Sequence, residues 1–136
     1  MVPKNLRFAD THEWASIDTD SYADSASTIC TVGITQFAVE QLTDVVFVEL
    51  AKLGKKVAVK DAFGQIESVK SVNDLYAPVA GEIIARNDAL EKDPTLVSAD
   101  PYGKGWMMKI KMSAKADYDK LLTPEDYEKQ IASQAH

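Results

Sequence analysis

Lys70 lies in a polar turn between two strand-like segments, and its surroundings set it apart from the other lysines. An apolar strand leads in through Ile66 and Val69, and an Ala77-Pro-Val-Ala-Gly81 turn leads out. This arrangement would hold the amine away from the body of the protein, where another enzyme could reach it. A lysine amine forms a stable amide, but with a reference pKa of about 10.4 it is a cation that needs an activated acyl donor. The spacing therefore favours a lysine acylated by a dedicated ligase over an ordinary solvated turn lysine.

Other reactive side chains are scarce. Cys30 is the only cysteine, which excludes an internal disulfide and a multi-cysteine metal site. It alternates with apolar neighbours, so we expect a buried small hydrophobe. The two histidines are His12 and His136, which leaves acid–base catalysis and zinc binding poorly supplied. We expect a protein without a catalytic site or a metal.

Composition and charge restrict the partners. Hydrophobic residues make up 46% of the 136 residues and charged residues 26%, as in a globular protein. The net charge of −6 disfavours nucleic acid. No segment approaches the roughly 18 to 20 apolar residues of a membrane-spanning helix, and residues 1–8 resemble no secretory signal. We expect one monomeric domain over residues 1–136, with a β body at about 6–112 and a helical segment at about 113–133.

Short strands separated by turns dominate the chain after about residue 26. The predicted strands cover residues 27–34, 45–50, 57–59, 62–69, 75–78, 82–85 and 106–112. Residues 18–25 are predicted to form an exposed hairpin loop, 70–74 a polar turn, and 87–98 a loop with a possible helical turn. Along the last strand, Trp106 and Met108 should face one side and Met107 the other. This pattern is typical of a compact β-sandwich or barrel.

Two helices carry start signals. Thr35 is a plausible N-cap for a short helix through Leu42. Thr123, Pro124 and the acids that follow are a typical helix start. Tyr127 and Ile131, four residues apart, could dock this C-terminal helix on the body.

The lysine hairpin also carries a resemblance. Glu67-Ser-Val-Lys70-Ser, followed by Ala77-Pro-Val-Ala-Gly81-Glu, resembles the lipoyl-lysine hairpin of the glycine cleavage H-protein family. Further motifs agree in order and spacing: Thr11-His-Glu-Trp14, Val32-Gly-Ile-Thr35, Asp44-Val-Val-Phe-Val-Glu-Leu50, and Asp100-Pro-Tyr-Gly103 with Gly105-Trp106. The resemblance spans about residues 6–128 and implies a mainly β, hammerhead-type barrel-sandwich hybrid of the lipoyl/biotinyl-carrier kind. The chain departs from the family pattern at Thr43 (usually glycine), at Ala51 (often proline), and in a longer 18–25 loop.

The resemblance implies a role for each matching position. Lys70 would carry covalently attached lipoate. Glu67, otherwise a solvent-facing carboxylate at a strand end, would be recognised by the lipoate-attaching enzyme. Thr11, Glu13 and Asp74 would line a cleft that holds the loaded arm, with the two carboxylates pairing with its cationic amine. The neighbouring His12 and Trp14 are expected to serve packing and hydrogen bonding.

The same resemblance implies a cycle of partners. A pyridoxal-phosphate glycine decarboxylase would load an aminomethyl group, a tetrahydrofolate-dependent aminomethyltransferase would receive it, and dihydrolipoyl dehydrogenase would reoxidise the dithiol. Contacts that serve several enzymes in turn should be small and polar. The compartment would be the cytoplasm of a bacterium or, in a eukaryote, the mitochondrial matrix.

Other interpretations remain open at this stage. The chain could be a lipoyl or biotinyl domain of a larger complex, although the His-Glu-Trp start and the Thr-Pro-Glu-Asp helix argue against it. It could also be an H-like protein that relays lipoyl groups to other acceptors, or a binding module without lipoate. Met107 to Met112 is similar to a biotin-carrier motif, but Lys109 and Lys111 lie in a continuous strand and should face solvent.

Overall fold

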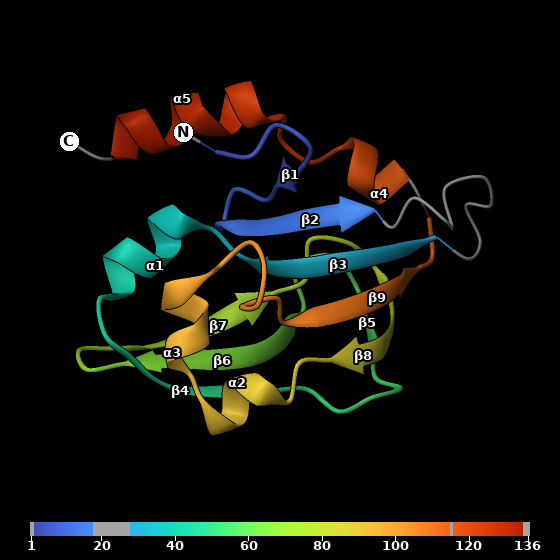
Figure 1. Cartoon of the computed structure of the whole chain (residues 1–136). Coiled ribbons are helices and arrows are strands. Elements are labelled where there is room, and N and C mark those ends of the chain that lie inside the picture. Colours follow the sequence, from blue (N-terminus) through green and yellow to red (C-terminus); the bar gives the residue numbers. More distant parts are fainter. Residues whose placement is uncertain (1, 18–27, 115, 135–136) are drawn as a thin grey trace.

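Two antiparallel sheets form the body of the protein (Figure 1). The computed structural model describes residues 2–17, 28–114 and 116–134, and the statements below refer to these. The six-stranded sheet has the order β1-β2-β3-β9-β8-β5, and the three-stranded sheet the order β4-β6-β7. Their bounds are β1 (Arg7–Phe8), β2 (Glu13–Ile17), β3 (Ile29–Ile34), β4 (Val45–Leu50), β5 (Lys56–Val57), β6 (Ala62–Ser68), β7 (Val72–Tyr76), β8 (Gly81–Arg86) and β9 (Met108–Met112).

Five short helices surround the sheets. They are α1 (Gln36–Leu42), α2 (Ala89–Lys92), α3 (Thr95–Ala99), α4 (Ala116–Asp119) and α5 (Pro124–Gln134). Helices α2 and α3 pack against β4, and α5 lies beside β1 at the edge of the larger sheet (Figure 1). No helix in the described part of the chain is long and apolar enough to cross a membrane. The predicted architecture, mainly β with short helices and a C-terminal helix, is confirmed.

The core lies between the inner faces of the two sheets. Cys30, Val32 and Ile34 alternate inward along β3, as predicted for this strand. The last strand is shorter than predicted, because it begins at Met108. Met107 precedes the strand and is fully buried, as Met108 is, so the predicted alternation does not extend to it; its backbone N–H donates to Val32 O at 2.8 Å.

Both predicted helix starts are confirmed. The Thr35 hydroxyl accepts a hydrogen bond from Ala38 N at 3.2 Å, and α1 ends at Leu42 as expected. Helix α5 begins at Pro124, and the Thr123 hydroxyl accepts from Asp126 N. These side chains replace hydrogen-bond partners that the first turn of a helix lacks.

Two segments differ from their prediction. The polar turn expected over residues 70–74 is shorter, because β7 already begins at Val72 and pairs with β6. The segment 87–98, predicted as a loop with one possible helical turn, contains α2 and the start of α3. The hairpin loop predicted for residues 18–25 lies outside the described residues.

Thr43 follows α1 with a φ of 65° and a ψ of −126°. A β-branched residue rarely adopts a positive φ, whereas glycine does so without steric strain. The turn between α1 and β4 therefore keeps a geometry suited to glycine although threonine occupies the position. Strain of this kind amounts to about 1–3 kcal/mol.

We expect Thr43→Gly to stabilise the protein. Relief of the strain should exceed the loss of about 0.5–1 kcal/mol from the greater freedom of glycine in the unfolded chain. The net gain should be about 1 kcal/mol in the free energy of unfolding, measured by urea denaturation. Thr43→Ala, which removes the hydroxyl and the methyl group but keeps Cβ, should give a smaller change, and a destabilised glycine variant would contradict the strain at this turn.

Candidate functional site

Lys70 lies at the tip of the β6–β7 hairpin, which projects from the body (Figure 1). Its side chain is exposed, and its ammonium makes no hydrogen bond or ion pair with any other described residue. A primary amine held in this way is open to a large reagent from several directions. The structure thus places this residue as the sequence predicted, on a turn away from the core.

Ser68 holds the turn that presents Lys70. Its buried hydroxyl accepts hydrogen bonds from Lys70 N at 3.3 Å and Ser71 N at 3.2 Å. Ser68 N donates to Ser71 O at 2.8 Å, which closes the end of the hairpin. Two-residue hairpin loops usually need positive φ angles, but Val69 and Lys70 have none. A side-chain oxygen therefore fixes a turn that has no glycine. Sequence reasoning missed Ser68, although a serine entering a polar turn is a recognised signal.

Glu67 lies on the outer face of the three-stranded sheet. It pairs with Phe47 of β4 and Val72 of β7, and directly opposed residues of antiparallel strands share a face. Its side chain is half-buried between these two apolar neighbours. The carboxylate is thus close to Lys70 in sequence and held at a fixed position on the same hairpin.

A cleft of about 350 Å³ lies between α1 and β7. Thr11, Glu13 and Asp74, which the resemblance places in a common cleft, all line it. Its apolar walls include Leu42 of α1 and Ile66 of β6. The cleft can therefore take a chain that is apolar along its length and polar at one end.

Glu13 is almost fully buried, at 2% exposure. The Thr11 hydroxyl donates to its Oε1, and Tyr76 N donates to Oε2 at 3.1 Å. Burial raises the pKa of Glu13 from 4.5 to about 7, although both hydrogen bonds act in the opposite direction. The Thr11 hydroxyl can donate to the carboxylate or accept from the neutral acid. Near neutral pH this carboxyl can therefore exist in either form.

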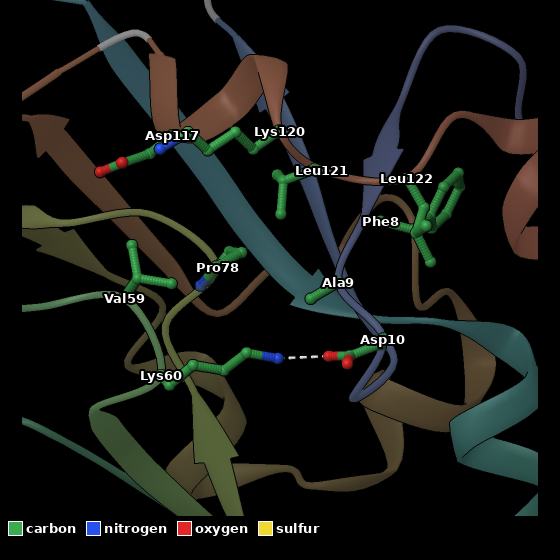
Figure 2. A pocket seen from close by; sticks show the side chains of 10 residues that line it. All are labelled: Phe8, Ala9, Asp10, Val59, Lys60, Pro78, Asp117, Lys120, Leu121 and Leu122. Atoms are coloured by element: carbon green, nitrogen blue, oxygen red, sulfur yellow. Dashed lines mark hydrogen bonds and ion pairs between the residues drawn. The ribbon is translucent and has the colours of Figure 1, made fainter.

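The turn that carries Thr11 is held by a hydrogen bond to α5 and by an ion pair to Lys60. Its His12 has a φ of 77°, and the His12 Nδ1 atom lies 2.8 Å from the Tyr127 hydroxyl of α5. On the other side Lys60 forms an ion pair with Asp10, and both residues line a second cavity of about 410 Å³ (Figure 2). Burial lowers the pKa of His12. His12 thus acts in hydrogen bonding, as expected.

Asp74 is placed differently from Glu13. It belongs to β7 and not to the turn, and its Oδ1 accepts from Gln65 Nε2 at 3.0 Å on the outer face of the sheet. Asn73 and Leu75, its neighbours along β7, also line the cleft, and alternation places them on the other face of the strand from Asp74. Asn73 is a cleft residue that sequence reasoning missed. The signal was the alternation with Leu75, which was hidden by ending the turn at residue 74.

Glu13 should make stability depend on pH. Below about pH 4.5 its carboxyl is protonated in the folded and the unfolded chain, and between 4.5 and 7 only the folded protein retains the proton. The stabilisation from this proton is therefore present at low pH and lost as pH rises through about 7. We expect the free energy of unfolding of Glu13→Gln, relative to the unmutated protein, to rise by about 2–3 kcal/mol between pH 4.5 and 8 in urea denaturation. A constant difference over this range would show that Glu13 titrates normally.

The chain matches the family model described as "Glycine cleavage H-protein" over residues 6–134. It is 46% identical over 129 residues to the glycine cleavage system H protein of Carboxydothermus hydrogenoformans, covering 95% of this chain and 93% of that protein. It is 47% identical to a probable glycine cleavage system H protein of Natronomonas pharaonis, covering 96% and 97% of the two chains.

The fold agrees with these sequence matches. The crystal structure of a glycine cleavage system H protein from Mycobacterium marinum superposes with a TM-score of 0.85 at 37% identity, covering 96% of this chain and 99% of that one. These matches are to H proteins over nearly their whole length, which favours the H-protein interpretation over a lipoyl or biotinyl domain of a larger complex. The chain belongs to the glycine cleavage H-protein family, the non-catalytic lipoyl carriers of the glycine cleavage system.

Proposed function

We propose that Lys70 is the lipoylated residue and that the cleft at Glu13 shelters the loaded arm. The observation that carries the proposal is the exposed ammonium of Lys70, which has no hydrogen bond or ion pair to the described residues and lies in the turn just before β7, a strand that lines the cleft. Members of the family generally carry lipoate. Attachment would convert a cation without a partner into an amide, so no interaction of the described residues is broken.

The cleft fits an arm of this kind. From Lys70 to Asp74 the backbone advances about 13 Å at ~3.3 Å per residue, a distance that a lysine extended by an acyl chain can span by folding back along β7. The apolar walls at Leu42 and Ile66 suit an aliphatic chain. When bound, lipoate supplies a disulfide–dithiol pair that carries the one-carbon unit.

Glu13 would hold the cargo. An ammonium brought beside this buried carboxyl favours its ionised form, so that the charge pair and the two existing hydrogen bonds offset its desolvation. The walls would also exclude water from the amine and slow its hydrolytic loss. Thr11 would orient the carboxylate through the bond to Oε1.

Membership of the glycine cleavage system implies three enzyme partners, the glycine decarboxylase, the aminomethyltransferase and dihydrolipoyl dehydrogenase. In this proposal a monomeric carrier meets each of them in turn. The relatives matched are bacterial and archaeal, which favours the cytoplasm over a mitochondrial matrix. Glycine–bicarbonate exchange with purified decarboxylase would distinguish this role from the relay of lipoyl groups to other acceptors.

Lys70→Arg should abolish lipoylation while the fold persists, because a guanidinium does not form the amide and the Lys70 side chain makes no hydrogen bond or ion pair with the described part of the chain. Intact-mass analysis after incubation with a lipoate ligase, lipoate and ATP should show one addition on the unmutated protein and none on the variant. Lys111→Arg, an exposed lysine within β9, is the matched control and should keep the addition. One lipoyl addition on Lys70→Arg would show that another residue is the site.

Glu13→Gln should speed loss of the aminomethyl group from the loaded protein. The amide keeps the shape and the bond from Tyr76 N but removes the charge that pairs with the amine. A charge-assisted hydrogen bond is worth about 1.5–3 kcal/mol, so the decay followed by intact mass should be about tenfold faster or more. The matched variant is Asp74→Asn, for which we expect little change, because the Asp74 carboxylate is bonded to Gln65. Equal decay rates for Glu13→Gln and the unmutated protein would refute a sheltering role for Glu13.

A further inference from the structure

Helix α5 holds the turn that precedes β2 through two side chains. The Tyr127 hydroxyl lies 2.8 Å from His12 Nδ1, and Gln130 Nε2 donates to Asp10 O at 2.8 Å. Residues three apart lie on the same face of a helix, so α5 presents this face to the turn. The C-terminal helix therefore contacts the segment that carries Glu13 into the cleft, although α5 is more than a hundred residues away along the chain.

Tyr127 also contacts the residue that begins α1. Its hydroxyl lies 2.7 Å from the hydroxyl of Thr35, which caps α1 by accepting from Ala38 N. The Tyr127 ring is fully buried and stacks on Phe8, with the ring centroids 4.6 Å apart. This packing fixes the hydroxyl independently of the two segments that it connects. One of these segments forms the α1 wall of the cleft, and the other carries Glu13.

The backbone of this turn needs support from its surroundings. His12 has a φ of 77°, a conformation that few residues other than glycine adopt. Such a conformation persists only where the neighbouring structure holds it from several directions. Ala9 closes the turn, because its N–H donates to Glu13 O at 2.8 Å and its carbonyl accepts from His12 N at 3.0 Å. A shift of His12 would therefore displace the adjacent Glu13.

We propose that Tyr127 is a positioning residue for Glu13, because its hydroxyl fixes the His12 turn relative to α1. The inference rests on the proposed sheltering role of Glu13. Tyr127 itself does not line the cleft, so it would touch neither the arm nor the cargo. It would act by holding the carboxylate at the place where the amine of the cargo arrives. A misplacement of about 1 Å, caused by a change far from the reacting group, can alter a rate by a large factor.

The donors and acceptors of these groups fit one chain of hydrogen bonds. Burial lowers the pKa of His12, which favours a neutral imidazole with one nitrogen free to accept. Tyr127 can then donate to His12 Nδ1 and accept from the Thr35 hydroxyl, while Thr35 accepts from Ala38 N. Removing the middle hydroxyl would leave both neighbours without this partner, and each would be free to move.

The test is Tyr127→Phe, which removes the hydroxyl and keeps the ring. The fold should persist, because Thr35 N still donates to His12 O at 3.0 Å and β2 still pairs with β3. We expect the lipoylated and loaded protein to lose its aminomethyl group about three- to tenfold faster, as followed by intact mass. The matched control is Tyr102→Phe, whose hydroxyl accepts from Gln36 N at 3.0 Å and thus supports α1 alone. We expect the control to change the decay rate less than twofold.

A double variant separates positioning from a general loosening of the fold. If Tyr127 acts through Glu13, adding Tyr127→Phe to Glu13→Gln should change the decay rate less than twofold, because the charge that Tyr127 positions is already absent. A residue that only loosened the fold would speed the decay by the same factor with and without the Glu13 carboxylate. That result would overturn the positioning role.

The remaining outcomes distinguish this inference from the function on which it rests. Urea denaturation checks that each variant is folded under the conditions of the decay measurement. An unchanged decay rate for Tyr127→Phe, or an equal acceleration by Tyr102→Phe, would overturn the positioning role and leave the sheltering role of Glu13 standing. An unchanged decay rate for Glu13→Gln would overturn the sheltering role itself, and this inference with it.

Discussion

One hydroxyl, that of the buried Tyr127 on α5, connects the two walls of the cleft by hydrogen bonds. It lies 2.8 Å from His12 Nδ1 and 2.7 Å from the Thr35 hydroxyl. Thr35 also caps α1, which forms one wall, and His12 belongs to the turn that brings Thr11 and Glu13 to the other. Burial raises the pKa of Tyr127, so its hydroxyl keeps its proton. The C-terminal helix thus contributes to the cleft without lining it.

The cleft holds its functional group in a fixed position, whereas the lysine turn leaves its functional group free to move. Glu13 is buried, with two hydrogen-bond donors fixed on it, whereas the Lys70 ammonium has no partner among the described residues. A group that must visit several enzymes gains from freedom, because ordering a long side chain loses conformational entropy. A group that must recognise one cargo gains from a fixed position and low dielectric. The turn that leads into β7 supplies the first condition, and the cleft that β7 helps to line supplies the second.

Local signals made part of this structure predictable. The start of α1 at Thr35 and of α5 at Thr123 follow from capping chemistry, which involves neighbours in sequence. The face of Asp74 was not predictable in this way, because it depends on where β7 begins and therefore on its pairing with β6. The burial of Glu13 depends on the backbone of Tyr76, more than sixty residues away along the chain. The bulge in β4 appears only in the register between strands, since its sequence is uniformly strand-forming.

Strand β7 serves two surfaces with alternate residues. Val72 and Asp74 share one face of the strand and Asn73 and Leu75 the other, with Asn73 and Leu75 lining the cleft and Asp74 bonded to Gln65. Because the side-chain period of a strand is two, adding or deleting one residue in the turn at Lys70 would exchange these two sets. We therefore expect this hairpin to accept only changes in length that preserve the phase of the strand, although exposed tips elsewhere tolerate insertions freely.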